Sequence, residues 1–161
     1  MTKIIIDIFM YLFEFLLLWY YSDSLFEAKR SNLKRISLML LNTVFLGAVY
    51  QLNITYLNVI LMFVTYALLL FYLYHISFKT AVFHALIFMV VMFASEILVM
   101  AISSALYKDF NAFETSPSAY LVMITTSKLI YFGLMIIILK LFAQKESHAP
   151  YNKYFWLLFV M

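Results

Sequence analysis

The sequence predicts an all-α protein, a polytopic bundle of transmembrane helices. Of its 161 residues, 66% are hydrophobic and only 12% are charged, whereas a typical soluble domain has about 45–50% apolar and about 25% charged residues. A chain of this length has too little interior to hide so much apolar surface from water. The composition therefore excludes an ordinary water-soluble enzyme domain, a disordered region and a nucleic-acid-binding module.

Five apolar stretches are long enough to be transmembrane helices, each of which needs about 20 mostly apolar residues. Barrel strands would alternate apolar and polar side chains over about ten residues, whereas residues 59–74 are apolar on every side. We therefore expect one transmembrane domain, 1–161, with five full helical spans and a partial sixth. The full spans cover 4–21, 36–52, 54–74, 80–107 and 118–142, and the partial span covers 154–161.

The basic residues predict that the N-terminus lies outside the cell, because lysine and arginine favour the cytoplasmic side of a membrane protein. In that orientation only Lys3 and Lys108 lie outside, and Lys128 lies within a span. We expect a multi-pass protein of the cell membrane, the bacterial cytoplasmic membrane in particular. Eight of the eleven basic residues then lie inside: Lys29, Arg30, Lys34, Arg35, Lys79, Lys140, Lys145 and Lys153.

The loop after the first span, residues 22–35, is both basic and amphipathic. In one interpretation its apolar side chains lie against the membrane while its basic side chains meet anionic headgroups. In the other, which we favour, the loop is a helical extension that joins two spans. The basic residues of this loop are Lys29, Arg30, Lys34 and Arg35.

Ionisable side chains inside spans are costly, so each is a candidate functional residue. Asp7 and Glu14 are seven residues apart in the first span and therefore share an acidic face of one helix. Asp7 lies near the outer end, whereas Glu14 is deeper and is expected to have a specific partner or to face the bundle interior. The alternative for both residues is snorkelling to the membrane interface.

Glu96 and Lys128 are predicted to form an ion pair inside the bundle. They lie on adjacent antiparallel spans, eleven residues before Tyr107 and ten residues after Ser118 respectively. At about 1.5 Å per residue, both lie roughly 15–17 Å below the outer surface. Opposite charges at the same depth can neutralise each other, which lowers the free-energy cost of holding either charge in lipid. In the alternative, each residue faces a separate polar cavity or another subunit.

No residue pattern predicts a catalytic, cofactor-binding or metal-binding site. The chain has no cysteine, no glycine-rich phosphate loop and no motif for a serine nucleophile. His75, His84 and His148 lack the spacing of metal ligands, so we expect them to be polar residues at the membrane interface. The chain by itself is therefore not expected to be an enzyme.

The layout resembles the membrane sensor region of Firmicutes GHKL-type histidine kinases, including the accessory-gene-regulator class that detects peptide pheromones. A basic inner loop follows the first span, and a minimal outer turn at 51–53 joins the next two. The resemblance covers nearly the whole chain. Its specific segments are 93–96, which contains a mid-span glutamate, 126–130, which contains a mid-span lysine, and the aromatic run 153–158.

The resemblance implies a receptor whose last span leads to a cytoplasmic dimerisation helix and an ATP-binding domain. Neither is present in this chain, and none of its histidines has the sequence context of the family's phosphoacceptor. The resemblance thus implies that the chain is the front part of a longer protein, with a homodimer formed through the missing kinase region.

Our leading hypothesis is a signal-sensing membrane domain whose ligand is an extracellular peptide or a small hydrophobic molecule, with access through 51–53 and 108–117. A small transporter or substrate-binding membrane subunit is the first alternative. It is disfavoured because the only glycines are Gly47 and Gly133, and both prolines lie outside the spans. The second alternative is a non-catalytic membrane partner, such as an immunity or assembly protein.

Overall fold

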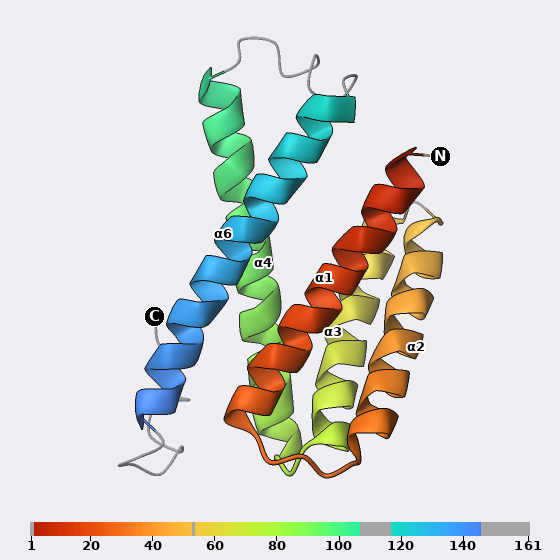
Figure 1. Cartoon of the computed structure of the whole chain (residues 1–161), viewed down its shortest axis with the longest axis vertical. Coiled ribbons are helices and arrows are strands. Elements are labelled where there is room, and N and C mark those ends of the chain that lie inside the picture. Colours follow the sequence, from red (N-terminus) through yellow and green to blue (C-terminus); the bar gives the residue numbers. More distant parts are fainter. Residues whose placement is uncertain (1, 53, 107–116, 146–161) are drawn as a thin grey trace.

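The computed structural model describes residues 2–52, 54–106 and 117–145, and within them the chain is helical (Figure 1). The prediction of an all-α protein is confirmed, since these residues form no β-strand beyond one isolated bridge between Ala28 and Tyr74. The helices are α1 (Thr2–Leu25), α2 (Asn32–Tyr50), α3 (Thr55–Leu73), α4 (Phe78–Leu106) and α6 (Pro117–Lys145).

The five helices form a closed ring. Each helix packs against the next along the chain, and α6 packs against both α4 and α1. The N-terminus, the turn between α2 and α3 and the start of α6 lie at one end of the bundle, which we call the N-terminal end (Figure 1). The connections 26–31 and 74–77 lie at the other end, called here the connection end. At the N-terminal end, α4 and α6 extend beyond the other three helices.

Four helices are long and apolar enough to cross a membrane. They are Asn32–Tyr50, Thr55–Leu73, Phe78–Ser104 and Leu121–Phe142, which correspond to the second to fifth predicted spans. α1 has 24 residues, and its assignment as a further span stays a prediction. The partial span 154–161 and the loop 108–116 lie outside the described residues.

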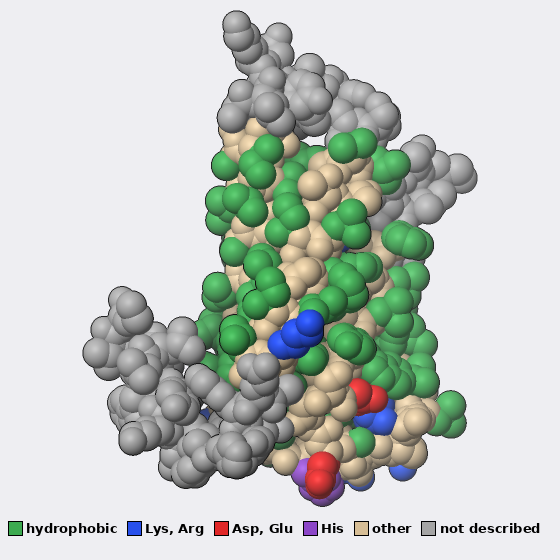
Figure 2. Space-filling view, turned by 60° about the vertical axis from the view of Figure 1, so that its left-hand side comes forward, with side chains coloured by type: hydrophobic (Ala, Val, Ile, Leu, Met, Phe, Trp, Pro, Cys, Tyr) green, Lys and Arg blue, Asp and Glu red, His purple; other side chains and the backbone are tan. Residues whose placement is uncertain are grey.

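Large apolar side chains cover the outside of the bundle as well as its interior. Figure 2 shows hydrophobic side chains over most of the described surface, with charged and histidine side chains mainly toward the connection end. Monomeric soluble proteins rarely expose such a continuous apolar surface, so this exterior fits a lipid environment. The exposed residues include Phe9, Leu16, Val44, Leu68, Val90 and Leu129.

The core contains small as well as large side chains. Ala81 and Ala85 on α4 are fully buried, and small residues one turn apart let a neighbouring helix approach closely. Ala101, the first member of a similar pair further along α4, is exposed. Ala81 and Ala85 therefore contribute to close packing, and Ala101 does not.

The predicted helical extension through 22–35 is wrong. α1 ends at Leu25 and α2 begins at Asn32, and the residues between them pair with the chain that follows α3. The amide of Lys29 donates to the Leu73 carbonyl at 2.8 Å, and the amide of His75 donates to the Glu27 carbonyl at 3.0 Å. These bonds satisfy backbone groups that a helix would otherwise satisfy, and they tie the two connections together.

Candidate functional site

Lys128 lies between two carboxylates contributed by two different helices. Its Nζ atom is 2.6 Å from Glu14 Oε1 and 3.2 Å from Glu96 Oε1. Glu14 and Lys128 are almost fully buried, whereas 39% of the Glu96 side chain is exposed. We call Glu14, Glu96 and Lys128 the Lys128 cluster.

The ring of helices determines which residues join this cluster. Glu96 on α4 and Lys128 on α6 belong to two adjacent antiparallel helices. Both residues lie at similar depths below the N-terminal end of the bundle. Glu14 joins them because α1 also packs against α6. The sequence predicts an acidic face shared with Asp7 and a specific partner or an interior position for Glu14, but it does not indicate that Lys128 is the partner. The side chain of Asp7 lies outside the described residues.

Neighbouring aromatic side chains complete the surroundings of the cluster. The Tyr66 hydroxyl on α3 donates a long hydrogen bond of 3.5 Å to Glu14 Oε2. Lys128 Nζ lies 5.8 Å from the centre of the buried Tyr131 ring, within reach of a cation–π attraction. Each buried charge therefore has an oppositely charged partner and a further polar or aromatic contact, which is the condition for holding ions in an apolar interior.

The Lys128 cluster forms part of the wall of a cavity of about 310 Å³. All five helices contribute to this wall: Tyr11 comes from α1, Tyr50 from α2 and Asn58 from α3, while the cluster supplies side chains of α1, α4 and α6. Most of the remaining wall is apolar, formed by Met10, Val59, Met62, Met92, Phe93, Val99, Met100, Met123 and Ile124. A small number of polar groups in an apolar hollow is typical of ligand sites.

Two buried polar atoms of lining residues lack a hydrogen-bond partner among the described residues. They are Asn58 Oδ1 and Ser127 Oγ. The amide nitrogen of Asn58 donates to the Tyr11 hydroxyl at 3.2 Å, so only its oxygen is unsatisfied. The exposed Thr126, next to Ser127 on α6, donates to a carbonyl of its own helix, as hydroxyls in membrane helices usually do. The Ser127 hydroxyl, at the cavity wall, forms no such hydrogen bond.

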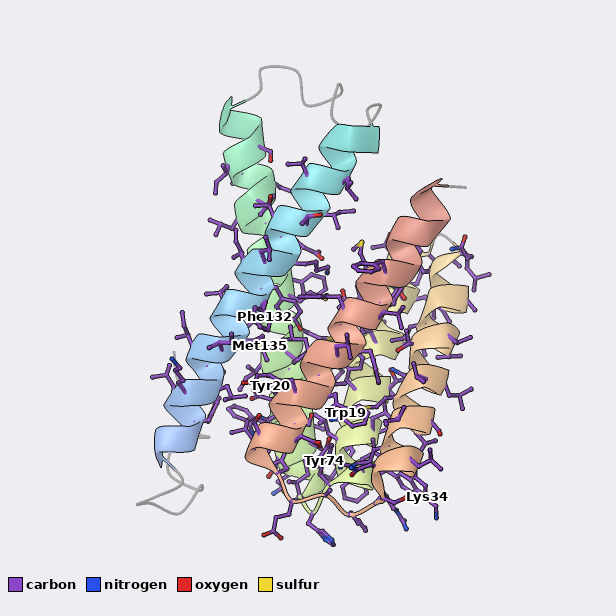
Figure 3. All side chains as sticks on the ribbon, in the orientation of Figure 1. Trp19, Tyr20, Lys34, Tyr74, Phe132 and Met135 are labelled. Atoms are coloured by element: carbon purple, nitrogen blue, oxygen red, sulfur yellow. The ribbon has the colours of Figure 1, made fainter. Side chains whose placement is uncertain are left out.

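A second polar cluster lies at the connection end and holds Arg35 away from the surface. Arg35 forms an ion pair with Asp23 and a hydrogen bond with Asn32. Trp19 Nε1 and the Tyr74 hydroxyl also donate to Asp23, at 2.9 and 2.6 Å. We call Trp19, Asp23, Arg35 and Tyr74 the Asp23 cluster; Figure 3 shows Trp19 and Tyr74 toward the connection end. Burial, and then the bond to Asp23, raise the pKa of Tyr74, so its hydroxyl stays a donor.

The four basic loop residues have different surroundings in the structure. Lys29 and Lys34 are exposed, and Figure 3 shows Lys34 near the start of α2, directed away from the bundle. Arg30 lies 4.7 Å from the centre of the Tyr72 ring. The interpretation in which the basic side chains of this loop meet headgroups does not hold for Arg35, which is 5% exposed because Asp23 offers it a nearer counter-charge.

The expectation of interfacial histidines is wrong for His84. This residue is completely buried on α4, with its Nδ1 atom 2.6 Å from the Tyr21 hydroxyl. Aromatic rings, including those of Phe26 and Phe142, pack against it. His75 is exposed in the connection after α3, and His148 lies outside the described residues. Among the described residues no group of acidic, histidine or cysteine side chains is arranged to hold a metal ion.

Comparison with known proteins identifies no relative: no protein-family model matches the chain, and no curated protein or solved structure is significantly similar to it. The residues of the cavity and of the two clusters are therefore the basis for inferring the function.

Proposed function

We propose that the chain is a membrane-embedded signal-sensing domain whose ligand, an extracellular peptide side chain or a small hydrophobic molecule, occupies the cavity beside the Lys128 cluster. The observation that carries the proposal is that all five helices line this cavity. An occupant therefore touches every helix of the ring at once. A ligand that prefers one packing of these helices over another shifts the population toward that packing.

The proposal includes α1 as a fifth span and an N-terminus outside. α1 packs against α2 and α6, and the charge of Glu14, which would otherwise oppose insertion, is neutralised by Lys128. The positive-inside rule supports the orientation, because the basic residues of the connection 26–31 and of the first turns of α2 and α4 gather at the end opposite the N-terminus. These residues are Lys29, Arg30, Lys34, Arg35 and Lys79.

We further propose, from the resemblance described above, that the signal passes to a GHKL histidine kinase in a homodimer. The genomic reading frame that contains this chain tests this part of the proposal. A GHKL ATP-binding domain encoded in frame after Met161 supports it. A frame that encodes no such domain rejects the kinase and leaves the sensing domain to be tested separately.

Spin-label distances test the sensing proposal on the protein in lipid nanodiscs. Because the chain has no cysteine, labels attach only at introduced sites, such as the exposed Val44 on α2 and Leu129 on α6. Three compact probes of similar shape serve as ligands: adamantylmethylammonium, adamantylmethanol and adamantanecarboxylate. We expect at least one of them, at saturation, to shift the distance between the labels.

The matched control is Val99→Phe, which places a larger side chain at the cavity wall. Val99 is buried and lines the cavity, so this change should abolish the shift caused by the same probe. A distance distribution that no probe alters would reject the sensing proposal. A shift that persists in Val99→Phe would place the ligand elsewhere.

A substrate-binding or transport function is the second candidate. It is favoured by one observation, the position of three ionisable groups deep inside the helix bundle at a cavity, since such groups mark substrate and ion pathways in many transporters. Uptake into proteoliposomes distinguishes the two functions. Accumulation of a radiolabelled probe inside vesicles supports transport, whereas binding without accumulation supports sensing.

A further inference from the structure

We infer that the cavity binds a small apolar molecule that carries one ammonium group, with Glu96 as its principal anchor. This inference rests on the proposed function and specifies its ligand class. Three observations carry it: an excess of negative charge at the cavity wall, two buried polar atoms of lining residues that lack a partner, and an apolar lining rich in methionine.

The charge balance of the Lys128 cluster favours a cation. Two carboxylates face one ammonium, and among the described lining residues no other charged side chain is present. Lys128 lies closer to Glu14 than to Glu96, at 2.6 against 3.2 Å. Glu14 is also buried, whereas 39% of the Glu96 side chain is exposed. Glu96 is therefore the carboxylate that remains available to accept a hydrogen bond from a ligand.

An anion lacks a comparable anchor in this cavity. Lys128 is 8% exposed in its side chain and already bonded to both carboxylates. An anionic ligand would have to displace Glu96 or lie beside two negative charges. Repulsion between like charges is strong in an apolar interior because the dielectric constant is low.

The unsatisfied atoms at the cavity match the donors of an ammonium group. A primary ammonium has three N–H donors and no acceptor. The Glu96 carboxylate lines the cavity, and Asn58 Oδ1 and Ser127 Oγ belong to lining residues, are themselves buried and have no partner among the described residues. A buried polar atom without a partner is destabilising, so a ligand whose ammonium reaches these atoms through a small shift of the Asn58 and Ser127 side chains gains affinity from groups that the protein alone leaves unpaired.

The apolar lining determines the remainder of the ligand. Five methionines line the cavity, and their flexible thioethers adapt to apolar bodies of different shape. The volume of about 310 Å³ lies at the lower limit of ligand pockets, which range over about 300–1,000 Å³. The ligand is thus a single compact apolar group rather than a long chain. The five methionines are Met10, Met62, Met92, Met100 and Met123.

Equilibrium binding of radiolabelled adamantylmethylammonium to the protein in zwitterionic nanodiscs tests the inference, with empty nanodiscs subtracted. We expect saturable binding that unlabelled ammonium displaces at about tenfold lower concentration than adamantylmethanol, since a charge-assisted hydrogen bond accounts for about that factor. Adamantanecarboxylate should not compete. Glu96→Gln should weaken binding about tenfold, and Ser127→Ala should weaken it severalfold.

The matched control is Glu27→Gln, which removes the same charge from an exposed site at the connection end and should leave binding unchanged. Competition by the alcohol or the carboxylate that equals that of the ammonium would overturn the ligand class but leave the sensing cavity standing. Unaltered binding to Glu96→Gln would overturn the role of Glu96. Absence of saturable binding by each of the three probes, radiolabelled in turn, would instead reject the proposed function itself.

Discussion

Lys128 Nζ lies 2.6 Å from Glu14 Oε1, although the two residues are 114 positions apart in the sequence. This contact joins α1 to α6, the first and last of the described helices. It closes the ring of helices at the level of the cavity. The same lysine reaches Glu96 on α4, so one side chain connects three helices of the ring.

Breaking the contact between Glu14 and Lys128 should strongly destabilise the protein. Glu14→Gln or Lys128→Met leaves the opposite charge buried without its nearest partner, and such changes cost about 3–5 kcal/mol. The double variant removes both charges and should recover part of that loss. The free energy of unfolding, measured in mixed detergent micelles, checks this expectation.

The loss of unfolding free energy in the double variant, compared with the sum of the two single losses, shows whether Glu14 and Lys128 interact. Losses from Glu14→Gln and Lys128→Met that simply add in the double variant would contradict the pairing. Glu27→Gln serves as the control, because Glu27 is exposed at the connection end and surface substitutions usually change stability by less than about 0.5 kcal/mol.

Glu96 should contribute less to stability than Glu14. Its oxygen lies farther from Lys128, and a larger part of its side chain is exposed. We expect Glu96→Gln to cost about 1 kcal/mol, while its effect on ligand binding is large. The same unfolding assay gives the comparison. A loss equal to or greater than that of Glu14→Gln would show that Glu96 is mainly a structural residue.

The Asp23 cluster should stabilise the connection end of the bundle. Asp23→Asn weakens the contact to the buried Arg35, and we expect it to cost about 2–3 kcal/mol. Tyr74→Phe removes a single hydrogen bond to Asp23 and should cost about 1 kcal/mol. Lys34→Ala, at an exposed site on the same surface, is the control. Equal effects of all three changes on the midpoint of unfolding would argue against a specific cluster.

The orientation in the membrane can be read from labelling of single cysteines in intact cells. With the N-terminus outside, Gln51→Cys in the turn after α2 should react with a membrane-impermeant maleimide. Lys79→Cys at the connection end should react only after the cells are opened. Both residues are exposed, and the absence of native cysteine removes background. The reverse pattern would show that the N-terminus lies inside.

The sequence predicts the helices well because their signals are local. Long apolar stretches and Pro117 at the start of α6 depend only on neighbouring residues. The ion pair between Glu96 and Lys128 could be predicted for the same reason, since it requires only the helix rise and two consecutive antiparallel helices.

The contacts that the sequence does not predict depend on packing between distant segments. Nothing local to Glu14 indicates that α1 lies beside α6. Likewise, the sequence places Arg35 in a basic loop and does not predict that α1 brings Asp23 against it. The break at 26–31 also depends on a remote partner, because its amides and carbonyls pair with the chain after α3. The contact between α1 and α6 closes the ring, and no single segment of the sequence predicts that contact.

Photo-crosslinking tests the central claim, a ligand cavity at the Lys128 cluster, most directly. A diazirine analogue of adamantylmethylammonium is irradiated with the protein in nanodiscs, and the attachment sites are mapped by mass spectrometry. We predict adducts on cavity residues such as Glu96, Met100 and Met123, reduced by an excess of the unlabelled ammonium. Adducts confined to side chains on the outside of the bundle, such as Leu68 and Val90, and unaffected by that excess, would contradict the claim.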